Sequence, residues 1–131
     1  MKIYVAGKFE EKERILEIYS KLKALGHTVA YDWTTHKYIQ PYKENQNMAA
    51  RYSENELTGI SQSDVFIYLS HDQGHTLHME FGAALILNKK FGKPTIFVIG
   101  DCSKSPWYFN PRVKRRDSVE EVLAELEKLK C

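Results

Sequence analysis

The sequence has little of what marks secreted, membrane-bound or nucleic-acid-binding proteins. Only two cysteines are present, Cys102 and Cys131, which is too few for a disulfide framework and favours a reducing compartment. No apolar run approaches the length of a membrane span, and the chain begins with a strand pattern rather than a signal peptide. We therefore expect a cytoplasmic protein without a membrane partner.

A strong excess of charge of either sign is also absent. The 19 basic and 17 acidic residues leave a net charge of +2, so we expect no nucleic-acid polymer as a partner. Repeats and low-complexity segments are missing too. Since 43% of the 131 residues are hydrophobic, the chain can form one packed core, and we expect a single domain over residues 1–131.

The most informative stretch runs from Ser63 to Ala84. Its apolar segment Val65–Leu69 is short and rich in β-branched and aromatic residues, which predicts a buried parallel strand. A polar loop follows, and from Thr76 apolar side chains recur at helical spacing. Glu80 lies in the first turns of that helix. Because ligands of open α/β sheets bind where loops leave the strand ends, Glu80 is the first candidate functional residue.

Strands and helices alternate along the rest of the chain. The other predicted strands are Lys2–Ala6, His27–Tyr31, Thr95–Ile99 and Arg112–Arg116. The other predicted helices are Glu10–Leu25, Glu44–Ser61 with Ala49, Ala50, Leu57 and Ile60 inward, and a last helix that Ser118 and Glu121 begin as a capping box. This pattern predicts an α/β three-layer sandwich with a five-stranded parallel sheet in the flavodoxin/Rossmann-like order 2-1-3-4-5.

Three loops should converge at the carboxyl edge of such a sheet: Gly7–Phe9, Asp32–Tyr42 and Ser70–His75. The first, a glycine and a lysine before a helix, is either a phosphate-binding turn or a plain connection. The second is either a surface loop with packed aromatic residues or a wall over a base-sized ligand. Trp33, Tyr38 and Trp107 are candidates to stack on such a base.

Glu80 and Glu56 are carboxylates expected on neighbouring helices, with Tyr4 and Asp64 in or near the same pocket. Such a pair suits glycosidic chemistry, in which one group attacks the anomeric carbon or supports an oxocarbenium-like transition state and the other handles a proton. The N-terminal end of a helix is expected to keep Glu80 ionised and nucleophilic. The other interpretation is a surface glutamate that only complements the helix dipole.

A rival interpretation rests on five residues of metal-ligating types at one loop–helix junction: His71, Asp72, His75, His78 and Glu80. They suggest zinc or iron. However, Gly74 interrupts any helix between the first two histidines, and no His-Glu-x-x-His motif is present. We expect the histidines to line the pocket or to pack against the loop, and we predict no metal and no cofactor.

Four segments then carry a family resemblance. They are Ile3–Phe9 (IYVAGKF), Glu56–Ile60 (ELTGI) with the following Ser63-Asp64-Val65, Met79–Ala84 (MEFGAA), and Lys93–Ile96 (KPTI). In this order and spacing, the chain from about residue 2 to residue 99 resembles the nucleoside 2-deoxyribosyltransferase family. That family includes the 2′-deoxynucleoside 5′-monophosphate N-glycosidases.

The resemblance implies that Glu80 is the nucleophile, that Glu56 stands at the family's acid/base aspartate, and that Tyr4 supplies an active-site hydroxyl. The implied reaction cleaves or transfers the N-glycosidic bond of a (deoxy)nucleoside or its 5′-monophosphate through a covalent sugar–enzyme intermediate. It also implies a homodimer in which Asn110, or a serine of the 103–105 segment, completes the neighbouring subunit's site. The remaining substrate-binding candidates are Gly7, Lys8, Phe9, Trp33, Asp64, Ser70, Gly74, Thr76 and His78.

Two departures from the family keep alternatives open. Thr76-Leu77-His78 stands where the family often has Gly-x-Gly, and Glu56 replaces an aspartate. A non-catalytic nucleotide-binding module on the same fold is the main alternative. A hydrolase of another N-glycoside, such as NAD, and a metal-dependent hydrolase are the others.

Overall fold

The five strands form one parallel sheet in the order β2-β1-β3-β4-β5, as predicted. The structure is a computed structural model and describes residues 1–129. The strands are β1 (Lys2–Ala6), β2 (Thr28–Val29), β3 (Val65–Leu69), β4 (Thr95–Ile99) and β5 (Val113–Arg116). An α-helix follows each of β1, β2 and β3 and leads to the next strand, whereas a long loop with a 3₁₀ turn at Pro106–Phe109 joins β4 to β5.

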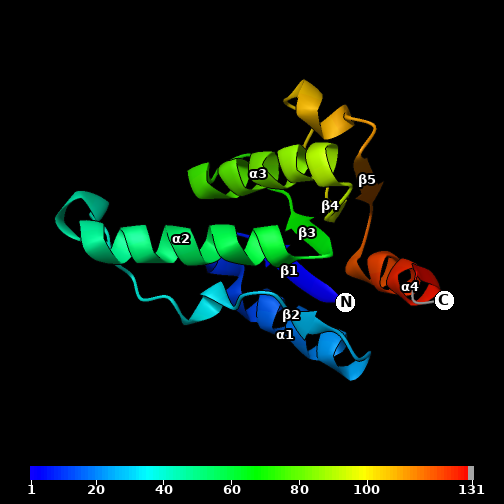
Figure 1. Cartoon of the computed structure of the whole chain (residues 1–131), viewed down its shortest axis with the longest axis horizontal. Helices are drawn as coiled ribbons and strands as arrows, with labels where there is room; N and C mark the ends of the chain where they lie inside the picture. Colours follow the sequence, from blue (N-terminus) through cyan, green and yellow to red (C-terminus); the bar gives the residue numbers. More distant parts are fainter. Residues whose placement is uncertain (130–131) are drawn as a thin grey trace.

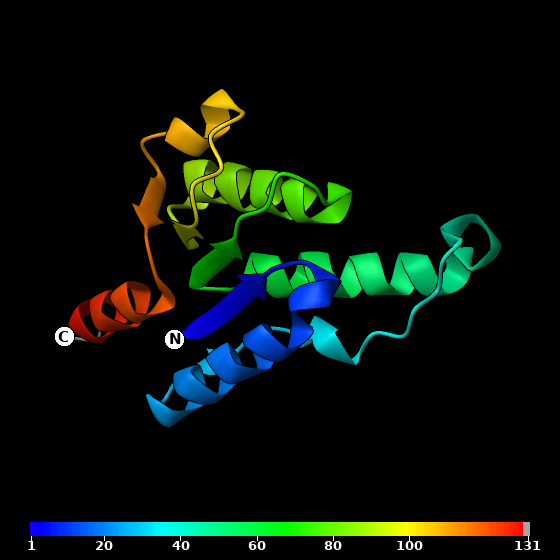
Figure 2. The ribbon, with the colours of Figure 1, turned by 180° about the vertical axis from the view of Figure 1, so that it is seen from behind.

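Helices cover both faces of the sheet, which gives the three predicted layers. The helices are α1 (Lys12–Ala24), α2 (Gln46–Gln62), α3 (His75–Phe91) and α4 (Val119–Leu129). Helices α2 and α3 lie side by side on one face, while α1 and α4 cover the other (Figures 1 and 2). Within residues 1–129, no helix is long and apolar enough to cross a membrane.

The two central strands of the sheet, β1 and β3, are almost entirely buried. All five residues of β3 are buried, and so is β1 from its second residue onward. Chain order reverses between these two strands, because β1 pairs with β2 on one side and β3 on the other. Such a reversal leaves a crevice at the carboxyl ends of the two strands, where doubly wound folds bind ligands.

Three predicted elements differ in extent. Only Thr28–Val29 of the predicted strand 27–31 pairs with β1, because Asp32 starts a 3₁₀ turn over Trp33–Thr35 by accepting a bond from the Thr34 amide. Helix α1 begins late because residues 9–11 form another 3₁₀ turn. At α4, the Ser118 cap is confirmed, since its hydroxyl accepts from the Glu121 amide at 3.2 Å. The Glu121 carboxylate, however, accepts from the amide of Asp117.

Helix α2 presents a different face to the sheet from the predicted one. Leu57 is 51% exposed and Ala50 is also exposed, so placing them inward was wrong. The reason is Gly59, on which a Cβ would lie 2.6 Å from the Cβ of Tyr31 and 3.3 Å from the ring of Tyr4. Because glycine has no side chain, α2 can approach β1 closely at this position. The face of α2 that packs on the sheet therefore includes Gly59, and Glu56 is half-buried beside it.

Candidate active site

The side chains of Tyr4 and Glu80 meet at the carboxyl edge of the sheet. Tyr4 is fully buried in β1, where its ring stacks on Phe66 of β3 with 5.7 Å between centroids. Its hydroxyl donates a hydrogen bond to Oε2 of Glu80 on α3. The strand thus fixes the phenol, and the phenol fixes one oxygen of the carboxylate.

Both candidate carboxyl groups bind protons more tightly than exposed glutamates do. Burial, followed by the nearby charge of Glu56, raises the pKa of Glu80 to about 8, although the hydrogen bond from Tyr4 acts to lower it. Burial raises the pKa of Glu56 to about 7. The expectation that the helix end keeps Glu80 ionised was therefore wrong. Glu80 is the sixth residue of α3, and the dipole effect fades within the first turn.

His36 is a site residue that the sequence patterns did not single out. Its Nδ1 lies 3.7 Å from Oε1 of Glu56, and its Nε2 is 2.6 Å from the hydroxyl of Tyr31. Its ring stacks on Tyr52 of α2 with centroids 3.7 Å apart. Burial lowers the pKa of His36. The signal that could have found it is a histidine inside the 32–42 loop, which was already a candidate wall of the pocket.

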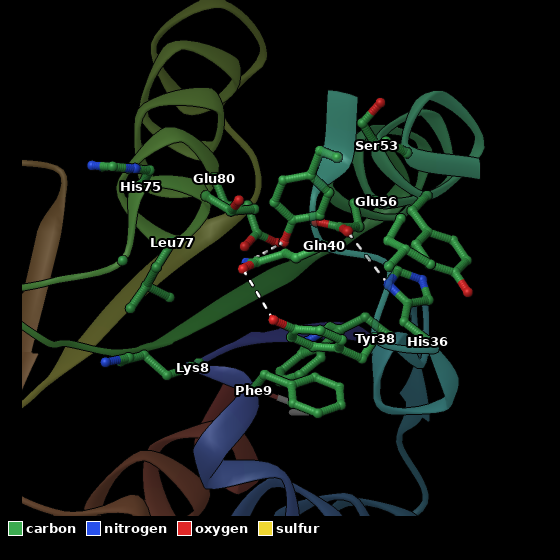
Figure 3. A pocket seen from close by; sticks show the side chains of 18 of the residues that line it. Lys8, Phe9, His36, Tyr38, Gln40, Ser53, Glu56, His75, Leu77 and Glu80 are labelled. Atoms are coloured by element: carbon green, nitrogen blue, oxygen red, sulfur yellow. Dashed lines mark hydrogen bonds and ion pairs between the residues drawn. The ribbon is translucent and has the colours of Figure 1, made fainter. Parts of the chain in front are cut away.

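Glu56 and Glu80 line a pocket of about 540 Å³ (Figure 3). The turn after β1, the segment 36–42, helix α2 and the start of α3 surround it. Six of the predicted substrate-binding residues line it, namely Gly7, Lys8, Phe9, Trp33, Gly74 and Thr76. The predicted convergence of three loops is therefore seen, and Tyr4 reaches the pocket through its bond to Glu80.

Asp64 does not line this pocket, and the expectation that it lies in or near it was wrong. It precedes β3, at the amino edge of the sheet, whereas the pocket lies at the carboxyl edge. There its Oδ2 accepts a hydrogen bond from the Lys2 amide at 2.8 Å, and its Oδ1 lies 3.9 Å from Nζ of Lys93. Its contacts tie β1 and β3 together and touch no other site residue.

Three more predicted residues are not among those that line the pocket. The Ser70 hydroxyl donates to the carbonyl of Ile99 at 2.8 Å, and Nε2 of His78 bonds the carbonyl of His71 at 2.9 Å. Asn110 accepts from the Arg112 amide at 3.0 Å. Its proposed role in a neighbouring subunit stays a prediction. Trp107 lies against Gly82 on the outer side of α3, away from any base in the pocket.

The histidine-rich junction does not converge on one point. His71 Nδ1 accepts from the Gln73 amide, and Asp72 forms an ion pair with Lys104 at 3.2 Å. Within residues 1–129, no group of three or more histidine, cysteine, aspartate or glutamate side chains is arranged to hold a metal ion. His75 alone of the three histidines lines the pocket.

The fold of the whole chain is similar to that of two solved enzymes. A CMP N-glycosidase from Clostridium botulinum is 17% identical, with a TM-score of 0.64 over 97% of this chain and 98% of that one. A 2-deoxyribosyltransferase from Bacillus psychrosaccharolyticus is 18% identical, with a TM-score of 0.61 over 93% and 90% of the two chains. These likenesses show the fold.

The sequence comparisons add no further relative. No family sequence model and no curated protein sequence matches this chain. The two structural neighbours are the kinds of enzyme that the sequence resemblance names, so the resemblance and the fold agree.

Proposed function

We propose that the protein cleaves or transfers the N-glycosidic bond of a nucleoside or nucleoside 5′-monophosphate, with Glu80 as nucleophile. The observation that carries this is the pairing of Glu80 with a buried tyrosine hydroxyl, beside a second buried carboxyl group, in a pocket large enough for a nucleotide. The CMP N-glycosidase and the 2-deoxyribosyltransferase of the same fold support the same class of reaction.

In the proposed mechanism, an oxygen of ionised Glu80 attacks C1′ of the sugar. The bond from C1′ to the base nitrogen breaks, and its electron pair leaves with the base, which takes a proton from Glu56. With a pKa of about 7, Glu56 is suited to give and take protons near neutral pH. Water, or a second base, then attacks C1′ and releases Glu80, while Glu56 accepts the proton of that nucleophile.

The Tyr4 hydroxyl has a positioning role and an electrostatic one in this mechanism. Because it donates to Oε2, it holds the carboxylate and favours its ionised form. Burial acts in the opposite direction and lowers the fraction of Glu80 that is ionised. The carboxylate that does form is poorly solvated by water, which favours its attack on the sugar. Burial also keeps the phenol of Tyr4 protonated by raising its pKa, so the hydroxyl remains a donor.

A 5′-phosphate would lie at the start of α3. Lys8, Gly74 and Thr76 line the pocket there, and no side-chain hydrogen bond caps the helix N-terminus. Free amide groups and a lysine are the usual partners of a phosphate. We therefore retain the 5′-monophosphates as proposed substrates beside the free nucleosides.

We also propose that the protein forms a homodimer, as the family resemblance implies. Three apolar side chains on the outer faces of α2 and α3 are strongly exposed: Leu57 at 51%, Met79 at 72% and Ile86 at 53%. A dimer interface over these helix faces would remove the three side chains from water. The mass in solution, compared between wild type and Met79→Glu, tests this proposal, and a monomeric wild type would contradict it.

The function is tested with a chromatographic panel. Deoxynucleosides, ribonucleosides, their 5′-monophosphates and NAD are incubated with the wild type, with Glu80→Gln and with the matched control Glu54→Gln, which alters an exposed glutamate of α2. We expect free base from the wild type and the control, and none from Glu80→Gln. A new nucleoside in the presence of a second base identifies a transferase.

One observation favours a second candidate function. At neutral pH a carboxyl group with a pKa of about 8 is mostly protonated, which suits a hydrogen-bonding nucleotide-binding site as well as a catalyst. No base release from any substrate, combined with measurable nucleotide binding, would reject the enzyme in favour of this binding module.

A further inference from the structure

The segment between β2 and α2 forms much of the pocket wall, and the proposed mechanism gives it no role. Seven of its residues line the pocket, including Tyr38, Gln40 and Tyr42. In Figure 3, Lys8, Leu77 and His75 lie on one side of Glu80, and Tyr38, His36 and Glu56 lie on the other. Since the first side holds the proposed phosphate end, a nucleotide with C1′ at Glu80 directs its base toward the second side.

The backbone on both sides of Gln40 is held firmly. Nδ2 of Asn45 donates to the carbonyl of Ile39 at 2.8 Å and to that of Pro41 at 3.1 Å. Earlier in the segment, the Lys37 amide donates to the hydroxyl of Tyr52 at 2.9 Å. The loop therefore presents the side chain of Gln40 from a fixed position, which reduces the entropy lost on binding.

Within residues 1–129, the carboxamide of Gln40 forms two hydrogen bonds, and both are long. Its Oε1 accepts from the Tyr38 hydroxyl at 3.4 Å, and its Nε2 donates to the Tyr42 hydroxyl at 3.3 Å, with the first bond visible in Figure 3. Each atom keeps hydrogen-bonding capacity, because a carboxamide has two acceptor sites and two N–H groups. The side chain is exposed, so a ligand can displace these contacts without opening the core.

We propose that Gln40 reads the hydrogen-bonding edge of the substrate's base. A carboxamide offers a donor and an acceptor side by side, and this pair matches a base edge on which an amino group adjoins a ring nitrogen. The phenol rings of Tyr38 and Tyr42, beside it in the pocket wall, supply apolar faces for the base. This inference rests on the proposed function and names the base class: one with an exocyclic amino group beside an acceptor, as in cytosine or adenine.

The test compares substrates that differ only in that amino group. CMP and AMP, in ribo and deoxyribo forms, are each paired with the analogue that lacks the amino group, namely the 2-pyrimidinone and purine nucleotides. Wild type is compared with Gln40→Met, which keeps the length but not the polar atoms. Gln46→Met is the matched control, because Gln46 begins α2 outside the lining of this pocket and bonds only the Lys43 carbonyl.

We expect the wild type and Gln46→Met to prefer the amino-bearing nucleotide by roughly 5- to 150-fold in kcat/KM, and Gln40→Met to reduce that ratio to near one. Calorimetric Kd values on a Glu80→Gln background should give the same ratios without turnover. Base release with an unchanged ratio in Gln40→Met, no preference in the wild type, or no binding of any nucleotide overturns the inference. A ratio that depends on Gln40 in Kd, without base release by the wild type, rejects the proposed function alone.

Discussion

The hydroxyl of Tyr4 donates a hydrogen bond to Oε2 of Glu80, although 76 positions separate the two residues in the chain. A residue of the central sheet thereby controls both the orientation and the charge of a residue on the covering helix. This control is open to measurement, because the phenol can be removed while the ring that stacks on Phe66 is kept.

We expect Tyr4→Phe to reduce kcat/KM roughly 10- to 100-fold at pH 7, which is the usual effect of losing a hydrogen bond to a charged group. The pKa of Glu80 should rise further, since the Tyr4 bond acts to lower it. The acid limb of the pH profile of kcat/KM should therefore move to higher pH. An activity loss with an unmoved limb would show that the hydroxyl acts on the substrate and not through Glu80.

The pH profile of the wild type should be a narrow bell with its maximum between pH 7 and 8. Activity rises as Glu80 ionises near pH 8 and falls as Glu56 loses its proton near pH 7, and the apparent values belong to the pair. Glu56→Gln should remove the alkaline fall and lower the maximum. A profile that is flat from pH 6 to 9 in the wild type would contradict these assignments.

The buried charge of Glu80 should cost stability at alkaline pH. Its pKa in the folded protein is about 8, above the ordinary value of 4.5, so the folded state binds more protons than the unfolded state between these values. Stability therefore falls as pH rises from about 4.5 to about 8. We expect Glu80→Gln to exceed the wild type by on the order of 4 kcal/mol at pH 8 and to match it near pH 4.5, as measured by urea unfolding. Glu54→Gln should track the wild type throughout.

His36 should act on Glu56 by excluding water. Burial is the cause of the raised pKa of Glu56, and the His36 ring, stacked on Tyr52, forms part of the cover. His36→Ala should admit water, lower that pKa and move the alkaline limb of kcat/KM to lower pH. His36→Phe keeps the ring but loses the nitrogen atoms facing Glu56 and Tyr31. Equal shifts in both variants would assign the effect to hydrogen bonding instead of burial.

Gly59→Ala tests the close approach of α2 to the sheet. Alanine normally stabilises a helix relative to glycine, but here its Cβ would lie 2.6 Å from the Cβ of Tyr31. We expect a net loss of ~1–3 kcal/mol in the free energy of unfolding. The neighbouring exposed position offers the control, since Thr58→Ala should be neutral or stabilising. A Gly59→Ala variant as stable as the wild type would mean that α2 tolerates a shift away from β1.

The strand order and the main carboxyl groups could be predicted because they depend on local patterns. The apolar run Val65–Leu69 and the helical spacing after Thr76 place Glu80 beside the carboxyl edge of the sheet without further information. The failed expectations concern the direction of side chains. The exception is Asp64, which directly precedes the strand Val65–Leu69, so a parallel sheet already places it at the amino edge, where it contacts Lys2 and Lys93.

The protonation of the two glutamates could not be predicted for a related reason. Their pKa values follow from burial, which depends on how closely α2 packs on β1, and that packing depends on a contact between Gly59 and Tyr31. His36 was missed because its contacts with Tyr52 and Glu56 depend on how the loop after β2 packs against α2. A histidine that is held by ring stacking and a hydrogen bond does not produce a repeating pattern in the sequence.

The anchored segment between His36 and Asn45 has a consequence for engineering and for divergence. It is one continuous piece of chain, held by the side chain of Asn45 and by the bond from the Lys37 amide to Tyr52 of α2, while Glu80 and Tyr4 stand on α3 and β1. Replacing this piece exchanges much of one wall of the pocket and leaves the attacking carboxylate and its phenol in place. Replacing this one segment can therefore change which substrate is bound, with little effect on the folding of the sheet.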